Sequence, residues 1–322
     1  MTALLPDFDL SRPQSAEEAV AQRLAAPASR YLAGGTDLIV NMRRGLVETD
    51  LLIDLTGIAE LASLSADESG FHIGAGVSLA ELAAHPAVLN DYAAIVQAAS
   101  AVAGPGHRAA ATLGGNLCLD TRCLYYNQSE WWRRSNDYCL KYRGDVCHVA
   151  PTGDTCRAAF SGDLAPALLV HDAEVEIAGP EGRRRLPLAE LYRDDGAAHL
   201  TLAPQELLVA VHLPADPRRS AYEKIRLRGA IDFPLAGVAV AITDDGRMRR
   251  LKIAVTGTNS RPFLIADLDD LDAGQLGEAE LVRIEKAVQK QVSPLRTTMV
   301  AGHYRRLAAA TLARRLAAGL AG

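Results

Sequence analysis

Two short stretches of small residues decide the fold prediction for this sequence: Leu32-Ala-Gly-Gly-Thr-Asp-Leu38 and Ala111-Thr-Leu-Gly-Gly-Asn-Leu117. Each contains a Gly-Gly pair, and glycine permits backbone conformations and close approaches that other residues exclude. Backbone N–H groups that converge on one point form a nest for an anion such as a diphosphate. Either stretch alone is typical of an ordinary turn. Together, each entering apolar structure, they favour a dinucleotide as ligand.

A third glycine pair, Gly74-Ala-Gly76, resembles the start of a nicotinamide fingerprint, because it follows a predicted strand and precedes a predicted helix. The third glycine of that fingerprint would fall at Leu79. We therefore predict a structural turn here and no nicotinamide site.

Hydrophobic periodicity around these stretches predicts both helices and strands. Ser15 and Glu18 have the spacing of a capping box at the start of the first helix. Leu307, Leu312 and Leu316 are predicted to lie on one face of the last helix. A C-terminal sheet followed by helices indicates an α+β class. The predicted strands are 30–33, 51–55, 71–75, 173–177, 222–227, 236–242 and 250–255, and the predicted helices are 16–25, 79–84, 92–103, 278–290 and 303–318.

Composition excludes several classes of function. The chain has 322 residues, enough for two or three domains with their own cores. Its net charge of −5 leaves no broad basic field for a nucleic acid. The apolar run 164–170 is much shorter than the roughly 20 residues that cross a bilayer. No cationic segment precedes an apolar core at the N-terminus, so we expect a cytoplasmic protein without membrane contact.

The cysteines are the second strong signal, because all 5 of them fall between positions 118 and 156. An odd number without an export signal argues against a disulfide framework. Four thiolates suit an iron–sulfur cluster or zinc, and no pair has the two-residue gap of a zinc knuckle. The irregular stretch around them needs metal ligation to become ordered. An iron–sulfur cluster is the favoured interpretation, and zinc or free thiols are the alternatives.

Three further motifs join the two glycine stretches: Ile73-Gly-Ala-Gly76, Gly162-Asp-Leu-Ala-Pro166 and Phe233-Pro-Leu-Ala236. As a set, they resemble the flavin-binding subunits of the xanthine dehydrogenase/carbon monoxide dehydrogenase family of molybdenum hydroxylases, over essentially the whole chain. The resemblance implies a vanillyl-alcohol-oxidase-type FAD-binding domain over 1–216, with α+β subdomains of about 1–56 and 57–216. A C-terminal α+β domain over 217–322, a sheet packed with helices, would follow.

The resemblance also implies which residues contact FAD. The first glycine stretch would wrap the diphosphate, and the second would contact the diphosphate and its ribose. Asp163 matches an aspartate that contacts FAD, and Val102 matches a position packed against the flavin. Leu208 and Lys224 match positions near the adenine and isoalloxazine portions, although Lys224 is equally well explained as a solvated lysine at a strand end. The implied set is Leu32, Ala33, Gly34, Gly35, Thr36, Asp37, Leu38, Val102, Thr112, Gly115, Asn116, Asp163, Leu208 and Lys224.

An insertion over about 122–158 carries the cysteines and narrows the resemblance. The segments Asn116-Leu-Cys-Leu-Asp-Thr-Arg-Cys123, Tyr126-Asn-Gln-Ser-Glu-Trp-Trp132 and Tyr138-Cys-Leu-Lys-Tyr142 look like the flavin subunits of 4-hydroxybenzoyl-CoA reductases, one branch of the family. That branch holds a 4Fe–4S cluster in such an insertion. The implied ligands are Cys123, Cys139, Cys147 and Cys156, with Cys118 as a buried spare that could exchange roles with Cys123.

The implied activity is electron transfer. Electrons from a ferredoxin would pass through the 4Fe–4S cluster and FAD to 2Fe–2S clusters on a small subunit and molybdopterin on a large one. There 4-hydroxybenzoyl-CoA would be reductively dehydroxylated to benzoyl-CoA, in a dimer of heterotrimers. The insertion has 6 Lys or Arg against 4 Asp or Glu, a net of +2 that would suit an acidic donor. The alternatives are the FAD subunit of another molybdenum hydroxylase that oxidises an aromatic or N-heterocyclic substrate, and a non-enzymatic zinc- or FAD-binding module.

Overall fold

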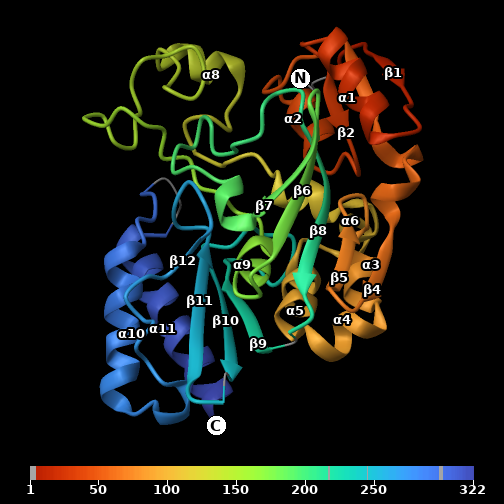
Figure 1. Cartoon of the computed structure of the whole chain (residues 1–322). Coiled ribbons are helices and arrows are strands. Elements are labelled where there is room, and N and C mark those ends of the chain that lie inside the picture. The colour runs from red at the N-terminus through yellow and green to blue at the C-terminus, as the bar shows by residue number, and fades with distance from the viewer. Residues whose placement is uncertain (1–4, 217, 245, 297–299) are drawn as a thin grey trace.

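Three sheets organise the chain in the computed structural model, which describes residues 5–216, 218–244, 246–296 and 300–322 (Figure 1). Pro217, the first residue of the predicted C-terminal domain, lies outside the described residues. The sheets have three, five and four strands and are accompanied by helices, so the predicted α+β class is confirmed. In the described part of the chain, no helix is long and apolar enough to cross a membrane.

The N-terminal residues form a small parallel sheet with the strand order β1-β3-β2. Ser15 caps the first helix as predicted, because its Oγ accepts a hydrogen bond from the backbone N–H of Glu18 at 3.1 Å. The Glu18 carboxylate binds the N–H of Gln14 and not that of Ser15, so only half of the predicted capping box forms. The elements are β1 (Asp9–Ser11), α1 (Ala16–Ala25), β2 (Arg30–Leu32), α2 (Leu38–Arg43), β3 (Leu51–Asp54), η1 (Leu55–Gly57) and η2 (Ala59–Ala62).

The middle of the chain builds a five-stranded antiparallel sheet with the order β4-β5-β8-β6-β7. Strand β8 lies between β5 and β6 in the sheet. Because the helices and the cysteine insertion come between β5 and β8 in the sequence, the sheet is complete only when β8 has joined it. The elements are β4 (Leu64–Asp67), β5 (Gly70–Gly74), α3 (Leu79–Ala84), α4 (Pro86–Asp91), α5 (Ala93–Ala101), α6 (Pro105–Ala110), α7 (Leu113–Leu117), α9 (Leu164–Leu169), β6 (Glu174–Gly179), β7 (Gly182–Pro187), η3 (Leu188–Leu191) and β8 (Leu207–Pro214).

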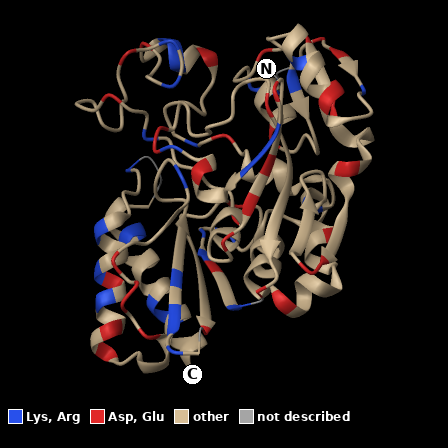
Figure 2. Ribbon diagram, in the orientation of Figure 1, with Lys and Arg blue, Asp and Glu red and all other residues tan. Residues whose placement is uncertain are grey.

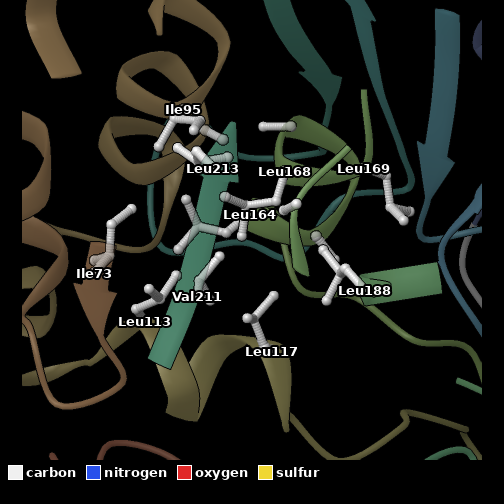
Figure 3. Packing of buried hydrophobic residues seen from close by; sticks show 14 of the residues in the cluster. Ile73, Ile95, Leu113, Leu117, Leu164, Leu168, Leu169, Leu188, Val211 and Leu213 are labelled. Carbon is white, nitrogen blue, oxygen red and sulfur yellow. The ribbon is translucent and has the colours of Figure 1, made fainter. Parts of the chain in front are cut away.

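Aliphatic side chains from this sheet and from α9 form the main core. Alternation along the strands turns Ile73, Val175 and Val211 to the same face, where none of them is exposed. They meet Leu164 and Leu168 of α9, which are also fully buried (Figure 3). Each such side chain contributes about 1.5–3 kcal/mol when it is removed from water. Burial of aliphatic surface therefore fixes the position of the segments before and after α9.

The predicted structural turn at Gly74-Ala-Gly76 is pressed against Leu61. A Cβ at Gly74 would overlap the carbonyl oxygen of Leu61, and a Cβ at Gly76 would lie 3.0 Å from the Leu61 Cβ. Close packing against this backbone accounts for both glycines.

The C-terminal part is an antiparallel sheet with the order β12-β11-β10-β9, covered by two helices (Figure 1). Its elements are β9 (Arg219–Ile225), β10 (Ala236–Asp244), β11 (Arg249–Thr256), β12 (Phe263–Leu264), η4 (Ala273–Gln275), α10 (Glu278–Gln291) and α11 (Gly302–Ala321).

The buried face of α11 differs from the face predicted to carry its leucines. Leu312 is buried, but Leu307 is 40% exposed and Leu316 is only partly buried. Ala309 and Ala313 occupy the centre of the contact instead, and neither is exposed. The large residues therefore do not mark the buried face, because alanines bring the helix close to its neighbours.

The cysteine insertion projects beside the N-terminal sheet and above the C-terminal sheet in Figure 1. Its one α-helix is α8 (Glu130–Ser135), and the rest of residues 122–158 consists of turns and isolated bridges. Asp137, Tyr138 and Arg143 have positive φ angles of 53°, 58° and 60°. The segment is therefore irregular, in agreement with the loss of apolar periodicity in the sequence.

Candidate functional site

The two glycine stretches meet in space although they are far apart in the sequence. A Cβ at Gly34 would overlap the carbonyl oxygen of Ala110 and would lie 3.1 Å from the nitrogen of Ala111. The turn after β2 therefore rests directly on the peptide that leads into the second stretch. Gly35 follows with φ +68°, a conformation that L side chains rarely adopt. Both glycines are required by the backbone itself.

The first stretch presents a run of unused backbone donors. Within the described residues, the N–H groups of Gly34, Gly35, Thr36, Asp37 and Leu38 donate to no protein acceptor. Buried or half-buried backbone donors are nearly always paired in native proteins. Consecutive free N–H groups at the start of a helix form an anion-binding concavity. The first stretch therefore fits a diphosphate, as predicted from its composition.

Most backbone amides of the second stretch donate to acceptors within the protein, unlike those of the first. Leu113 and Gly114 donate to the carbonyl groups of Val77 and Ala75 at 2.9 and 2.7 Å. Gly115 donates to Thr112 Oγ1 at 3.1 Å. The nest predicted for this stretch does not form, because residues 75–77 and the Thr112 cap already accept its protons.

Besides the Thr112 N–H, which has no acceptor among the described residues, the donors left to the second stretch are side chains. Among the described residues, Asn116 Nδ2 has no partner, whereas its Oδ1 accepts the N–H of Leu164 at 3.1 Å. The Thr112 hydroxyl accepts from Gly115 and its own proton is free to donate. Thr112 and Asn116 thus fit the contacts that the resemblance implied for them.

Asp163 and Lys224 form a buried ion pair next to the second stretch. Lys224 Nζ lies 2.9 Å from Asp163 Oδ1, and the two side chains are only 3% and 4% exposed. The Tyr222 hydroxyl donates to the same carboxylate at 2.5 Å. Burial raises the pKa of Asp163, and Lys224 opposes this shift. Lys224 is therefore not the solvated strand-end lysine that the sequence also allowed.

Val102 and Leu208 have different surroundings. Val102 ends α5, and its carbonyl accepts a hydrogen bond from Arg108 at 2.9 Å. The next residue, Ala103, has φ 41° and accepts the N–H of Ile231 at 3.3 Å, which brings residue 102 near the loop before Phe233. The Leu208 side chain is 4% exposed and packs in the main core, and the residue pairs with Ile177 across β8 and β6.

Arg122 connects the cysteine insertion to the first glycine stretch, a contact that no local pattern in the sequence predicts. Its guanidinium forms an ion pair with Asp37 and donates to Asn41 Oδ1 at 3.2 Å. It also lies over the ring of Phe233, 5.2 Å from the centroid. Burial lowers the pKa of Arg122. One residue thus joins the N-terminal stretch, the insertion and the C-terminal domain.

Four of the five cysteines lie in one neighbourhood. Burial raises the pKa of Cys123, and the adjacent thiols of Cys139 and Cys147 raise it further. Burial raises the pKa of Cys156 to about 12, and the thiols of Cys147 and Cys123 contribute. Cys118 is apart from this group and neighbours Tyr192. All five are free thiols, with Cys139, Cys147 and Cys156 buried.

The thiols do not form a closed metal site. In residues 5–216, 218–244, 246–296 and 300–322, no three His, Cys, Asp or Glu side chains are arranged to hold a metal ion. The donor set nevertheless suits a thiolate-bound cluster, because four free thiols share a buried region and the fifth is separate.

Buried cations hold the insertion in place of an aliphatic core. Arg133 is 2% exposed, donates to the Gly45 carbonyl at 2.8 Å and lies 4.8 Å from the Tyr142 ring centroid. Lys141 binds Asp120 at 2.7 Å and lies 4.5 Å from the centroid of the Tyr126 ring. With Arg122, three of the six basic residues of the insertion point inward. The basic face predicted from the net charge is therefore reduced, and Figure 2 shows acidic and basic residues interspersed.

Comparisons with known proteins agree with this arrangement. Residues 6–216 match the family described as the FAD binding domain in molybdopterin dehydrogenase, and residues 220–320 match the CO dehydrogenase flavoprotein C-terminal domain. The aldehyde oxidoreductase FAD-binding subunit PaoB of Escherichia coli (strain K12) is 34% identical over 272 residues, which cover 81% of this chain and 85% of that protein. The carbon monoxide dehydrogenase medium chain of Afipia carboxidovorans is 26% identical over 260 residues, 80% of this chain and 76% of that one.

Solved structures share the fold. Carbon monoxide dehydrogenase from Hydrogenophaga pseudoflava superposes with a TM-score of 0.79 at 21% identity, over 99% of this chain and 100% of that chain. Quinoline 2-oxidoreductase from Pseudomonas putida 86 gives a TM-score of 0.77 at 19% identity, over 99% and 100%. With the family matches, these likenesses show that the chain belongs to the FAD-binding medium subunits of the xanthine dehydrogenase/carbon monoxide dehydrogenase family of molybdenum hydroxylases.

Proposed function

We propose that this chain is the FAD- and 4Fe–4S-carrying electron-transfer subunit of a molybdenum reductase of the 4-hydroxybenzoyl-CoA type. The observation that carries the proposal is the gathering of Cys123, Cys139 and Cys147 with Cys156 in an insertion joined to the first glycine stretch. A flavin converts between one- and two-electron transfer, and a thiolate-bound cluster holds single electrons.

The first glycine stretch is proposed to bind the FAD diphosphate. The unused N–H groups from Gly34 to Leu38 would donate to its oxygens, and the positive φ of Gly35 turns the backbone toward them. Thr112 and Asn116 would add donors from the opposite side, since Gly34 rests on the peptide before Thr112. Leu32, Ala33 and Leu38 would line the cradle, and Gly115 would leave it open.

The Asp163–Lys224 pair is proposed to position the flavin and to keep water from it. Lys224 also donates to the carbonyl of Asp232 at 3.1 Å, so it ties the loop before Phe233 to the sheet. Val102, near the same loop, would pack against the ring system. The backbone of Leu208 would complete the adenine side, because its side chain is committed to the core.

The proposed cluster ligands are Cys123, Cys139, Cys147 and Cys156. Cys118 is left out of the proposed set because it lies apart from them, beside Tyr192. Arg122 immediately precedes Cys123 and contacts Asp37 of the FAD-binding stretch. It would fix the distance between the two cofactors and would place a positive charge between them. This short connection supports a direct passage of electrons between cluster and flavin.

The proposed partners are a small subunit with 2Fe–2S clusters and a large molybdopterin subunit, together with a ferredoxin as donor, in a dimer of heterotrimers. Arg122, Arg133 and Lys141 point inward and form ion pairs within this chain, so they contribute little to electrostatic attraction of an acidic ferredoxin. Apolar side chains on the insertion, with Trp131 70% exposed and Leu124 48% exposed, offer another basis for the ferredoxin contact.

The competing function is oxidation by another molybdenum hydroxylase, with electrons leaving through this subunit. The relatives favour it, because they include an aldehyde oxidoreductase subunit at 34% identity and the nicotinate dehydrogenase FAD-subunit of Eubacterium barkeri at 25% identity. The gathered thiols favour the reductase, since an added low-potential carrier suits electrons that enter.

The test isolates the complex from its native host through a tag on this chain and assays both directions. We expect dehydroxylation of 4-hydroxybenzoyl-CoA with reduced ferredoxin, and little oxidation of aldehydes or N-heterocycles with an artificial acceptor. Turnover of an aldehyde or an N-heterocycle without any dehydroxylation would establish the competing function.

A further inference from the structure

Two histidines face each other on the face of the five-stranded sheet that is opposite the main core. His72 of β5 and His212 of β8 are directly paired across the strands. Their Nδ1 atoms are 3.4 Å apart, and the ring centroids are 4.8 Å apart. Phe71 and Leu213 beside them point into the core, so both imidazoles lie on the solvent side of the sheet.

The outer nitrogens of both rings have partners that accept a proton. His212 Nε2 lies 3.0 Å from Glu176 Oε2, and an ionised carboxylate can only accept. His72 Nε2 lies 3.1 Å from Ser63 Oγ. The Ser63 hydroxyl already donates its single proton to the carbonyl of Glu60 at 2.7 Å, so it accepts from His72. Both imidazoles therefore carry their proton on Nε2.

This assignment leaves two Nδ1 lone pairs facing each other across 3.4 Å, an arrangement that either a bridging proton or a metal ion between them would stabilise. Two nitrogen ligands about 2.0–2.1 Å from one tetrahedral ion lie about 3.3 Å apart. Ligating histidines typically donate their second N–H to a carboxylate or a similar acceptor, which fixes the tautomer. Glu176 and Ser63 occupy these outer positions.

The surroundings can complete such a site. The histidines line an open groove of about 800 Å³, together with Glu174. Glu174 is paired with His212 across β6 and β8, is exposed and has no hydrogen-bond or ion-pair partner among the described residues. Among the described residues, no third His, Cys, Asp or Glu side chain is placed to bind a metal ion together with these two histidines. A rotation of the Glu174 side chain, or water, would supply the remaining ligands.

We propose that His72 and His212 bind one divalent transition-metal ion, such as zinc or nickel, through their Nδ1 atoms, with Glu174 as a third ligand. The ion would link β5 to β8, two strands that are far apart in the sequence. Imidazole nitrogen with one carboxylate suits zinc and nickel and is a poor set for calcium or magnesium.

The test titrates zinc chloride and nickel chloride into the full-length chain, purified anaerobically with its cofactors. The variants are His72→Gln and His212→Gln, and the matched control is His303→Gln, an exposed histidine on α11. We expect each of the first two substitutions to weaken one binding event at least tenfold, and the control to leave it unchanged. Glu174→Gln should weaken it by a smaller factor, about two- to fivefold. Equal unfolding midpoints of all variants in EDTA would show that folding is intact.

Spectroscopy distinguishes metal bound at the histidines from metal bound at the cysteines. Zinc X-ray absorption of the bound form should show nitrogen and oxygen ligands, and the nitrogen contribution should fall in His212→Gln. The proposal is wrong if neither histidine substitution changes binding, or if the bound zinc has only sulfur ligands. In the first case a proton bridges the pair, and in the second the metal is on the cysteines.

Discussion

Ile73, Val211 and Leu168 of the five-stranded sheet domain are fully buried among aliphatic neighbours, whereas the insertion over 122–158 buries Arg133 and Lys141 against aromatic rings. The first region is held by removal of apolar surface from water, which is non-directional and cooperative. The second depends on a few directed contacts and on its thiols. We therefore expect the flavin domain to fold without the insertion, whereas the insertion should need the domain and, on the proposed function, a bound cluster.

The largest expected effect on cofactor binding comes from separating the two glycine stretches in the flavin domain. In Gly34→Ala the new Cβ would overlap the Ala110 carbonyl, so the stretches must move apart and the free amides lose their alignment. We expect the FAD content after purification to fall about tenfold or more, a loss of at least about 1.4 kcal/mol in binding. Gly106→Ala is the control, because a Cβ there meets nothing within 4 Å. Equal flavin absorbance in both variants would contradict the proposed diphosphate cradle.

The largest expected effect on stability tests the buried ion pair that joins Asp163 of the flavin domain to Lys224 of the C-terminal domain. Lys224→Met leaves the Asp163 carboxylate without its cation in a site that is 4% exposed. Removing one partner of a buried pair costs about 3–5 kcal/mol. Arg315→Met, which removes an exposed pair with Glu223, is the control and should cost less than about 1 kcal/mol. Urea unfolding measures both, and similar midpoints would mean that the Asp163 site is better solvated than the structure indicates.

Acid should weaken the flavin domain through His171. Burial lowers the pKa of His171 to about 4, and its Nε2 lies 3.0 Å from Ser220 Oγ. A depressed pKa contributes stability above the unfolded value of 6.5, and this contribution is lost as the pH falls toward 4. We expect a loss of about 3 kcal/mol over that range. His171→Gln should flatten this part of the urea-midpoint curve, and an unchanged slope would show that His171 is already charged when folded.

The smallest effect is local to the insertion. Arg133→Met removes the hydrogen bond to Gly45 and the contact with Tyr142, at a cost of about 1–2 kcal/mol. We expect faster hydrogen exchange within 122–158 and an unchanged rate in β5 and β8. Arg134→Met, an exposed neighbour on α8, is the control. Faster exchange throughout the molecule would mean that the insertion and the flavin domain unfold together.

Much of the fold was predictable because its signals are local. Helix α1 has the predicted bounds, since the Ser15 cap and the helical periodicity are contained in neighbouring residues. Strands β10 and β11 extend one or two residues beyond their predicted ends. The buried face of α11 was not predictable from residue size, because its alanines are selected by close packing against elements distant in the sequence.

The sequence predicted which residues belong to the candidate site, but not which of their groups are free to bind a ligand. Both glycine stretches look alike in the sequence, but the carbonyl groups of Ala75 and Val77 use the amides of the second and leave those of the first. Arg122 was missed for the same reason, since Asp37 and Phe233 reach it only after folding. The sequence around Lys224 has no local feature that would distinguish a buried lysine from an exposed one.

The central claim is that the insertion holds a cluster through Cys123, Cys139, Cys147 and Cys156 without Cys118. The most direct test measures iron, acid-labile sulfide and FAD in anaerobically purified wild type, Cys139→Ser and Cys118→Ser. We expect about four iron and about four sulfide per chain in the wild type and in Cys118→Ser, and almost none in Cys139→Ser, with FAD retained in all three. Intact flavin without iron in the wild type, or equal iron in both variants, would contradict the account.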